Sequence, residues 1–460
     1  MAIVLPTSKP NRARKGSLPE EVRDMVVSFY CLRRACTKHS LAQHLTFCCY
    51  RYKLISHNKK WKTMNLMRFC KLAACHVMTL IASITYAEDG YDFLPPSATP
   101  LPSSAPITIG MSNALTGPTG ALGTDFRTGA QIYFDRINEH GGIHGRKLNL
   151  VSYDDGYEPV ATISNTRTLL EKDKAFLLFG YVGTPTSRVT LPIAARLGIP
   201  FIAPFTGAGF LRQPDMPVVF NVRASYADET EAMVKYLTET LHFTRIGLFI
   251  QDDAYGSAGR NGARKALEKR NLQVVSVGKY KRNTSDILPA LDKLRAANPQ
   301  AVIMVGAYAP SAAFIQQARK TGFNPVFMNV SFVGTQQLTE ALGRDGEGVY
   351  ITQVMPSPYD TSLPLIRAYQ ADATNSKVPN MNMFNYGTLE GYVGANVLVH
   401  MISSTGSALS RAAFISTSEN LGRFNISGLN FSFSPNNHQG STRVYLTRIV
   451  SGTVVPAAMQ

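Results

Sequence analysis

The sequence predicts an α/β fold with parallel central sheets divided between two domains. From about residue 106 onward, short apolar runs alternate with longer amphipathic stretches, an order typical of βαβ units. This alternation restarts at residue 245 after an extended segment at 218–226, where we expect the chain to cross between domains. The 460 residues are enough for two or three domains.

Strands are expected wherever a short apolar run ends at glycine, proline or small polar residues. These runs lie at 107–111, 147–153, 176–180, 199–203, 218–222, 245–250, 273–277, 301–305, 325–329 and 348–354, with two late strands at 431–433 and 442–450. The 3.6-residue periodicity predicts helices at 125–139, 159–172, 228–241, 257–270, 285–296, 309–320, 335–342 and 386–402.

The net charge of +16 is concentrated before residue 88. Residues 1–87 contain 15 lysines and arginines but three acidic residues, which leaves 32 basic and 28 acidic residues for the remainder. All six cysteines also precede residue 88. The charge therefore does not indicate nucleic acid binding by the folded part. A cysteine-free body suits an oxidising compartment and excludes thiol nucleophiles and thiolate metal sites there.

Residues 64–87 have the pattern of a secretory signal peptide. Arg68 and Lys71 form a charged n-region, 72–84 an apolar h-region, and small residues precede a cleavage site near Glu88. The apolar run is too short for a comfortable membrane span. We therefore expect secretion through a cleaved signal peptide.

A signal peptide must begin the chain in order to work, so residues 1–63 are expected to be a non-native or disordered extension that precedes the real start. A genuine basic cytosolic extension is the alternative. Residues 88–105 are rich in proline and serine and are expected to form a flexible linker.

Sequence signals for catalysis, cofactors or metals are missing. The P-loop, the glycine-rich dinucleotide fingerprint, the G-x-S-x-G elbow and H-E-x-x-H do not occur. Glu139, His140 and His144 could suggest a metal site, but their glycine-rich context favours a solvated turn. Asp154-Asp155 are expected to cap a helix or line the sheet edge. We therefore expect no enzyme activity, no cofactor and no metal.

The most informative stretch is 177–210, where two neighbouring strands both end in loops of hydroxyl residues and glycine. Thr184 follows the first strand, and Phe205, Thr206 and Gly207 follow the second. Ligands of open α/β sheets bind beyond the carboxyl ends of the strands. The helix that begins near Thr184 offers free N–H groups to a ligand carboxylate.

Further candidates lie at other loops. Tyr255, Tyr308 and Phe332 follow expected strands of the second domain, and Leu122 follows the first strand of the chain. A sparse set of hydroxyls and aromatic rings that converge from two α/β domains is typical of an apolar small-molecule cleft.

Eight segments in the same order resemble the solute-binding proteins of ABC transporters with the type 1 periplasmic fold, in the branched-chain amino-acid (Leu/Ile/Val) group. These segments are ITIGMSNALTGPTGALG, INEHGGIHGRKLNLVSYDDGYEP, FGYVGTPTS, LGIPFIAPFTGA, QDDAYGSAGRNGA, ANPQAVIMVGAYAPSAAFIQQARKTGF, GEGVYITQVMP and LEGYVGANVLV. The resemblance runs from about residue 106 to 455. It implies two Rossmann-like lobes joined by crossing strands, which close on a small ligand and then dock on a membrane permease.

The resemblance also implies boundaries and roles. Lobe 1 would comprise 106–225 and 356–428, and lobe 2 226–355 and 429–460. Thr184 matches the hydroxyl position that binds the ligand carboxylate, and the loop 205–208 supplies backbone and hydroxyl contacts. Tyr255 and Tyr308 match tyrosines that face the cleft. Leu122 matches a position often held by an aromatic lid residue.

One departure concerns the ligand amine. Amino-acid binders of the group pair the ligand ammonium with an acidic residue just after the strand that matches VFMNV, but this chain has Ser331-Phe332-Val333-Gly334 there. A buried ammonium without a counter-charge is unfavourable. The expected ligand is therefore a small carboxylate, and an aromatic or aliphatic acid without an amine fits better than an amino acid.

The expected protein is a monomeric solute receptor of the periplasm with a permease partner. Exposed carboxylates such as Glu229 or Glu231 are candidates for docking permease arginines. Three alternatives stay open: an input protein for a sensor kinase or chemoreceptor, a cytosolic ligand-sensing regulator, and an enzyme on the same architecture. A neighbouring permease gene, an uncleaved cytoplasmic protein or ligand turnover would distinguish them.

Overall fold

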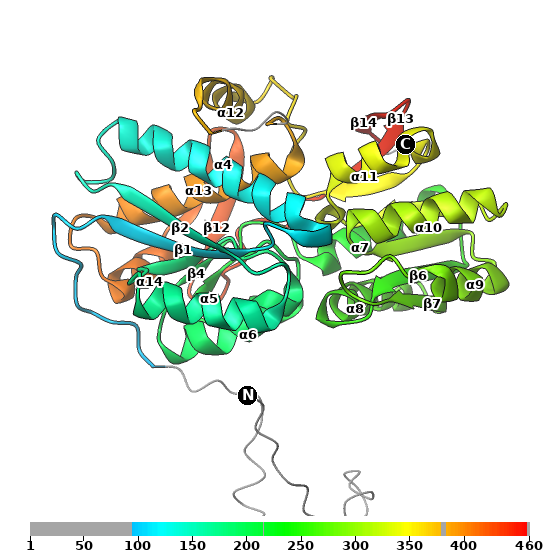
Figure 1. Ribbon diagram of the computed structural model, residues 1–460, viewed down its shortest axis with the longest axis horizontal. Helices are drawn as coiled ribbons and strands as arrows, with labels where there is room; N and C mark the ends of the chain where they lie inside the picture. Colours follow the sequence, from blue (N-terminus) through cyan, green and yellow to red (C-terminus); the bar gives the residue numbers. More distant parts are fainter. Residues whose placement is uncertain (1–93, 215, 379–382, 458–460) are drawn as a thin grey trace, which may run out of the picture. The chain divides into compact units, whose positions relative to one another are not determined.

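The computed structural model describes residues 94–214, 216–378 and 383–457. The expectations for residues 1–63 and for the signal peptide at 64–87 lie outside these residues. The described chain is built around two separate β-sheets with helices packed on them, coloured mainly blue, cyan and orange around one sheet and green and yellow around the other (Figure 1). The two-lobed α/β architecture expected from the sequence is confirmed.

The first sheet has five strands in the order β2-β1-β3-β4-β5, and all of its pairs are parallel. Its strands are β1 (Ile107–Asn113), β2 (Leu148–Asp154), β3 (Leu177–Phe179), β4 (Phe201–Ile202) and β5 (Val219–Phe220). Its helices are α4 (Gly120–Glu139), α5 (Pro159–Glu171), α6 (Thr184–Arg196), α12 (Pro364–Asn375), α13 (Tyr386–Thr405) and α14 (Arg411–Glu419). Strand β3 is completely buried, as its unbroken apolar sequence predicts.

The second sheet has seven strands in the order β14-β13-β10-β9-β8-β6-β7. Its parallel strands are β6 (Ile246–Gln251), β7 (Val274–Tyr280), β8 (Ala301–Val305), β9 (Val326–Asn329) and β10 (Tyr350–Gln353). The antiparallel strands β13 (Tyr445–Val450) and β14 (Thr453–Pro456) complete one edge. The helices are α7 (Tyr226–Lys235), α8 (Ala254–Glu268), α9 (Leu288–Ala297), α10 (Tyr308–Lys320) and α11 (Thr335–Leu342).

Local sequence explains where the helix α7 begins. Ser225 accepts a hydrogen bond from the backbone N–H of Asp228 at 3.1 Å, and Asp228 Oδ2 accepts one from the backbone N–H of Ser225 at 2.9 Å. This reciprocal pair satisfies two donors that helix formation would leave free. It fixes the point at which the chain leaves the first lobe and enters the second.

Helices α4 and α13 cross at unusually short range. A Cβ atom at Gly129 would lie 1.8 Å from the carbonyl oxygen of Thr388, and one at Gly391 would lie 2.0 Å from that of Phe126. Both positions therefore require glycine, because any side chain would force the helices apart. The close crossing brings the first turns of α13 to the edge of the first lobe, next to the loops that follow its strands.

Three connections join the lobes: 221–225 after β5, 354–363 after β10, and 434–444 before β13. The first and third run side by side, because Asn221 donates to the carbonyl oxygen of His438 at 2.9 Å and accepts from the backbone N–H of Gly440 at 2.7 Å. Three chain segments at one edge form a hinge of the kind that lets two lobes move as rigid bodies.

The structure differs from the sequence expectations near the C-terminus. Helices α12 and α14 were not expected, nor was the strand β11 (Gly422–Ile426). Residues 431–433, which we expected in the second lobe, belong to β12 (Leu429–Phe433), which pairs with β11 and not with the seven-stranded sheet. Phe433 packs on Phe220 of β5, with ring centroids 5.3 Å apart. This burial holds the hairpin against the first lobe.

The segment expected to be a flexible linker is bound to the first lobe over its described residues, 94–105. The backbone N–H of Leu101 donates to the carbonyl oxygen of Leu409 at 2.8 Å, and Ser97 accepts from the N–H of Ala412 at 3.0 Å. Arg146 donates to the carbonyl oxygen of Leu101 at 3.2 Å. These bonds replace contacts with water, so this proline-rich stretch is ordered.

Candidate functional site

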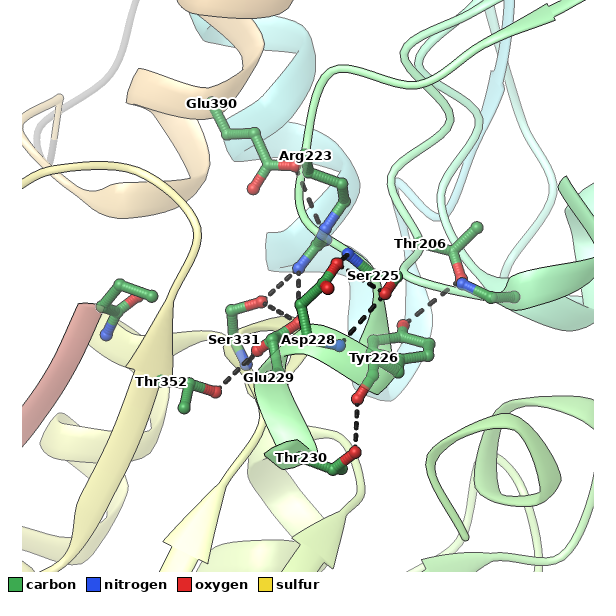
Figure 2. A network of polar contacts seen from close by, with 12 residues as sticks. Thr206, Arg223, Ser225, Tyr226, Asp228, Glu229, Thr230, Ser331, Thr352 and Glu390 are labelled. Atoms are coloured by element: carbon green, nitrogen blue, oxygen red, sulfur yellow. Dashed lines mark hydrogen bonds and ion pairs between the residues drawn. The ribbon is translucent and has the colours of Figure 1, made fainter. Parts of the chain in front are cut away.

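Loops at the carboxyl ends of β3 and β4 meet next to the inter-lobe connection, as the parallel register requires. Thr184, the first residue of α6, lies with its hydroxyl oxygen 2.6 Å from that of Thr206. Thr206 in turn donates to the hydroxyl of Tyr226 at 3.3 Å (Figure 2). All three side chains are buried. The two threonines expected to contact a ligand therefore hydrogen-bond each other.

Aromatic rings from both lobes meet beside these hydroxyls. Phe332, from the turn that follows β9, packs on Phe205 of the first lobe with a centroid distance of 5.4 Å. It also packs on Tyr255 at 4.8 Å, and Tyr255 lies 5.4 Å from Tyr226. Tyr157, from the loop after β2, completes the set at 6.2 Å from Phe332. The rings form an apolar contact between the lobes.

Leu122 and Tyr308 lie at a second point of contact between the lobes, around Gly334. The ideal Cβ position on Gly334 is 2.7 Å from Leu122 Cδ2 and 3.2 Å from Tyr308 Cδ1. Leu122 comes from α4 of the first lobe, and Tyr308 is the first residue of α10 in the second. Gly207 is equally confined, because its Cβ would lie 2.5 Å from the backbone nitrogen of Tyr226.

The replacement of Gly334 by alanine is expected to destabilise this arrangement of the lobes by about 1–3 kcal/mol. Gly334 has a φ of +84°, and the added methyl group would also collide with Leu122. Gly322→Ala is a matched control, because Gly322 has a φ of +74° but no atom within 4 Å of its Cβ position. Chemical denaturation should show a larger loss for Gly334→Ala, and equal losses would contradict a role of the contact with Leu122.

A buried arginine occupies the centre of the site. Arg223 lies in the first inter-lobe connection, directly after β5, and its side chain is 1% exposed. The guanidinium carbon is 5.0 Å from the ring centroid of Phe205, and Nη2 donates to Ser331 Oγ in the second lobe. Nε and Nη1 have no hydrogen-bond partner among the described residues. The site therefore contains a buried cation with two nitrogens that make no hydrogen bond, of which Nη1 lies only in a long ion pair with Glu390.

Glu229 and Glu390 balance the charge of Arg223 from opposite sides, one from each lobe (Figure 2). Each contributes an Oε1 at 3.5 Å from the guanidinium, Glu229 at Nη2 and Glu390 at Nη1. Burial would lower the pKa of Arg223, but the two carboxylates raise it above its usual value. The arginine therefore stays charged, and the lobes share one ion-pair cluster.

The position of Glu229 differs from what we expected from the sequence in two respects. We expected it to be exposed and available to a permease, but it is completely buried. It accepts hydrogen bonds from Ser331 N at 2.7 Å, Ser331 Oγ at 3.0 Å and Thr352 Oγ1 at 2.6 Å. The position after β9, which has no acidic residue of its own, is thus supplied with a carboxylate from α7. Glu231 is partly exposed but paired with Lys269 at 3.0 Å and with Arg270 at 2.9 Å.

Burial shifts the ionisation of the remaining charged groups around the site. It raises the pKa of Glu390 to about 7, and the nearby Arg223 only partly opposes this shift. It lowers the pKa of Arg212 to about 9, helped by the charge of Arg223. Asp125, which accepts a hydrogen bond from Gln337 at 2.9 Å, has its pKa raised by burial to about 6. Glu390 and Asp125 therefore titrate near neutral pH.

A small cavity lies between the lobes beside Glu390. Its lining includes Leu122, Asp125, Phe205, Ser331, Gln353 and Glu390. The volume of about 20 Å³ is enough for one water molecule. A solute the size of an amino acid fits only if the lobes first move apart.

Polar contacts also join the lobes on the side of Tyr157. Arg282 pairs with Glu158 at 2.8 Å, and Asn283 donates to the same carboxylate at 2.8 Å. Gln251 donates to the hydroxyl of Tyr157 at 3.3 Å. Opening of the cleft would expose these groups to water, which replaces the broken bonds at modest net cost.

The structure brings all eight residues proposed from the sequence into the contact zone between the lobes: Leu122, Thr184, Phe205, Thr206, Gly207, Tyr255, Tyr308 and Phe332. Their ligand contacts stay a prediction. The sequence reasoning missed Arg223, Glu390 and Tyr157. Arg223 directly follows an expected strand, so the strand-end rule that selected Thr184 would also have selected it.

None of the helices in the described ranges combines the length and the hydrophobicity of a membrane-spanning segment. The same residues contain no group of three histidine, cysteine or acidic side chains placed to hold a metal ion. The site is thus a cleft of aromatic, hydroxyl and paired charged groups between two α/β lobes. This combination defines the class of two-lobed solute-binding proteins.

Comparison with known proteins identifies the family. The profile described as "Periplasmic binding protein" matches residues 106–453, and the chain belongs to this family. It is 24% identical over 268 residues to the Leu/Ile/Val-binding protein of Escherichia coli K12, covering 58% of this chain and 72% of that protein. A Leu-, Ile-, Val-, Thr- and Ala-binding protein of Pseudomonas aeruginosa is 24% identical over 66% of this chain and 79% of its own. These relatives are binding proteins and not enzymes.

Solved structures agree with this assignment. A possible leucine/isoleucine/valine-binding protein from Rhodopirellula baltica SH 1 superposes with a TM-score of 0.72 and 36% identity, over 79% of this chain and 98% of that one. A branched-chain amino-acid ABC transporter protein from Thermus thermophilus with bound valine gives a TM-score of 0.70 at 19% identity, over 78% of this chain and 96% of that one, which supports the fold alone.

Proposed function

We propose that this protein is the periplasmic solute-binding component of an ABC importer and captures a small carboxylate between its two lobes. The family and the relatives named for branched-chain amino-acid binding support the class of function. The signal-peptide pattern at 64–87 supports delivery to the periplasm. A membrane permease is the expected partner, and the protein is expected to act as a monomer.

Two nitrogens of Arg223 that make no hydrogen bond carry the proposal of a carboxylate ligand. Nε and Nη1 belong to a side chain that is 1% exposed and lies against the face of Phe205. Buried donors without hydrogen bonds are costly, and guanidinium groups form strong, charge-assisted hydrogen bonds with carboxylates. The rings of Phe205 and Phe332 would hold the apolar part of the ligand.

Capture requires the lobes to open and close. The cavity of about 20 Å³ excludes a ligand in the present arrangement, whereas three connecting segments form a hinge. A ligand that bridges Arg223 and the second lobe would bind the closed arrangement more tightly than the open one. This difference in affinity sets how far the ligand shifts the equilibrium toward closure. Binding by closure needs no covalent chemistry.

An acid without an amine suits the charges of the site. The Glu229 carboxylate already accepts from Ser331 and Thr352 and faces Arg223, so little of it is left for a ligand ammonium. The Glu390 carboxylate accepts no hydrogen bond among the described residues but is itself paired with Arg223. The relatives named as amino-acid binders favour the second candidate, an amino acid with the same apolar side chain.

A thermal-shift experiment with isosteric pairs tests the proposal. We expect 4-methylpentanoate and 3-phenylpropanoate, the acids that correspond to leucine and phenylalanine without the amine, to raise the melting temperature of the purified protein. At a hundredfold excess over Kd, the stabilisation would be about 2.7 kcal/mol. Stabilisation by leucine alone would replace the amine-free acid with the amino acid. If neither acids nor amino acids stabilise the protein, the proposal of a carboxylate ligand is wrong.

A further inference from the structure

Glu390 is held much less firmly than the other carboxylate that faces Arg223. It lies near the start of α13 with its side chain directed at Arg223 (Figure 2), and it is 7% exposed. Its contact with the arginine is the 3.5 Å ion pair between Oε1 and Nη1. Within the described part of the chain, no hydrogen bond to the Glu390 carboxyl group is found.

Glu229 shows what a firmly bound carboxylate looks like in the same cluster. Both of its oxygens accept hydrogen bonds, two from Ser331 and one from Thr352, all within the second lobe. Protonation of Glu229 would weaken each of these bonds. Protonation of Glu390 would weaken only its 3.5 Å ion pair with Arg223. Of the two groups, Glu390 is therefore the one that can change its charge at low cost.

The surroundings of Glu390 contain a nearly balanced set of charges. Arg223 and Arg212 contribute positive charge, and Glu229 contributes negative charge. Asp125 of α4 lines the same cavity and accepts from Gln337 of α11. When Glu390 is ionised, two arginines face two glutamates, and Asp125 adds a further negative charge above its pKa of about 6. An anion at Arg223 would make this cluster still more negative in a site that excludes water.

We propose that Glu390 takes up one proton when a carboxylate ligand binds to Arg223, so that the cleft captures the anion together with a proton. This inference rests on the proposed function, because it assumes a carboxylate ligand. The protein, the ligand anion and one solvent proton combine into a complex in which the charge of the cluster is unchanged. No bond of the ligand breaks.

Protonation also changes what Glu390 can do. A neutral carboxyl group has one O–H donor, which can point at the ligand carboxylate, whereas an ionised one would repel it. The ligand would thus take the place of Glu390 as the counter-charge of Arg223. A zwitterionic amino acid brings its own positive charge, so it would leave Glu390 ionised and bind without proton uptake. Proton uptake by Glu390 therefore distinguishes anionic acids from zwitterionic amino acids.

Calorimetry of the intact protein in buffers of different ionisation enthalpy tests this inference. The probes are 4-methylpentanoate and 3-phenylpropanoate, with leucine and phenylalanine as zwitterionic counterparts. Because the pKa of Glu390 is about 7, we expect uptake of nearly one proton per bound acid at pH 8. Above the pKa of Glu390, the affinity for the acid should fall about tenfold for each unit by which the pH rises.

Glu390→Gln supplies the decisive comparison, because it keeps the shape of the side chain and cannot titrate. We expect the variant to bind the acids with near-zero proton uptake and little dependence on pH. Glu231→Gln is the matched control at a partly exposed position of α7, and it should retain the full proton uptake of the wild type.

The possible failures are distinguishable. Binding of an acid at pH 8 without proton uptake would overturn the inference and leave the proposed function intact. Proton uptake that persists in Glu390→Gln would also overturn it, because another group, such as Asp125 in the same cavity, would then take the proton. Binding of the amino acids alone would overturn the inference while preserving solute capture. If none of the four probes binds, the inference fails together with the proposed carboxylate ligand.

Discussion

Arg223→Met is expected to weaken carboxylate binding about a hundredfold or more and to lower the free energy of unfolding by about 3–5 kcal/mol at pH 8. The substitution removes the only cation that pairs with both Glu229 and Glu390 in the described cluster, while both carboxylates stay buried. It also removes the donors proposed for the ligand. Isothermal calorimetry would measure the loss of affinity, and denaturation in urea the loss of stability.

Two further variants separate charge from shape. Arg223→Lys keeps the positive charge and should retain more stability than Arg223→Met, but its single ammonium cannot replace the planar guanidinium, so binding should stay weak. The double variant Arg223→Met with Glu390→Gln removes one of the orphaned carboxylates and should recover part of the stability without recovering binding. Full ligand affinity in Arg223→Met would show that the carboxylate binds elsewhere.

The free energy of unfolding of the wild type is expected to fall by about 3 kcal/mol between pH 4.5 and pH 7 because of Glu390. The variant Glu390→Gln should not show this fall. The pKa of Glu390 is about 7 in the folded protein against an ordinary value of 4.5, because of burial. Between these values the folded protein holds a proton that the unfolded chain has released, so stability decreases as the pH rises. Above pH 7 both states are ionised, and the loss is complete.

The comparison of the two proteins isolates this effect. Asp125 has a pKa raised to about 6 and lowers the stability of the wild type in the same sense between pH 3.8 and pH 6, but it is unchanged in Glu390→Gln. The difference between the two stability curves should therefore grow up to about pH 7 and then stay constant. Glu231→Gln should give no such difference. Parallel curves for wild type and Glu390→Gln would show that the buried carboxyl group keeps an ordinary pKa.

Local sequence accounts for most of the fold. Strands such as Ala301–Val305 are continuous apolar runs, and helices such as Tyr308–Lys320 follow turn residues, so their positions depend on short-range pattern. The strand-end rule also placed Thr184, Thr206 and Phe332 at the contact between the lobes. The helices α12 and α14 were missed although their buried residues recur at helical spacing, at 365, 366, 369 and 373 in α12 and at 414, 415 and 418 in α14.

The charged centre of the site could not be read from local pattern. Acidic residues are exposed by default, and Glu229 was therefore expected on the surface. It is buried because Arg223, Ser331 and Thr352 compensate its charge, and Ser331 and Thr352 are more than a hundred residues away in the chain. Glu390 reaches the same arginine because glycines let α13 pack closely on α4.

The sequence thus specifies the alternation of strands and helices and the loops where a ligand can bind, because these follow from periodicity and from the direction of parallel strands. Which charges face one another across the cleft depends on how two lobes and three connections pack in space. The electrostatic interaction between Arg223 and Glu390 depends on their distance in the folded protein and leaves no periodic signal in the chain.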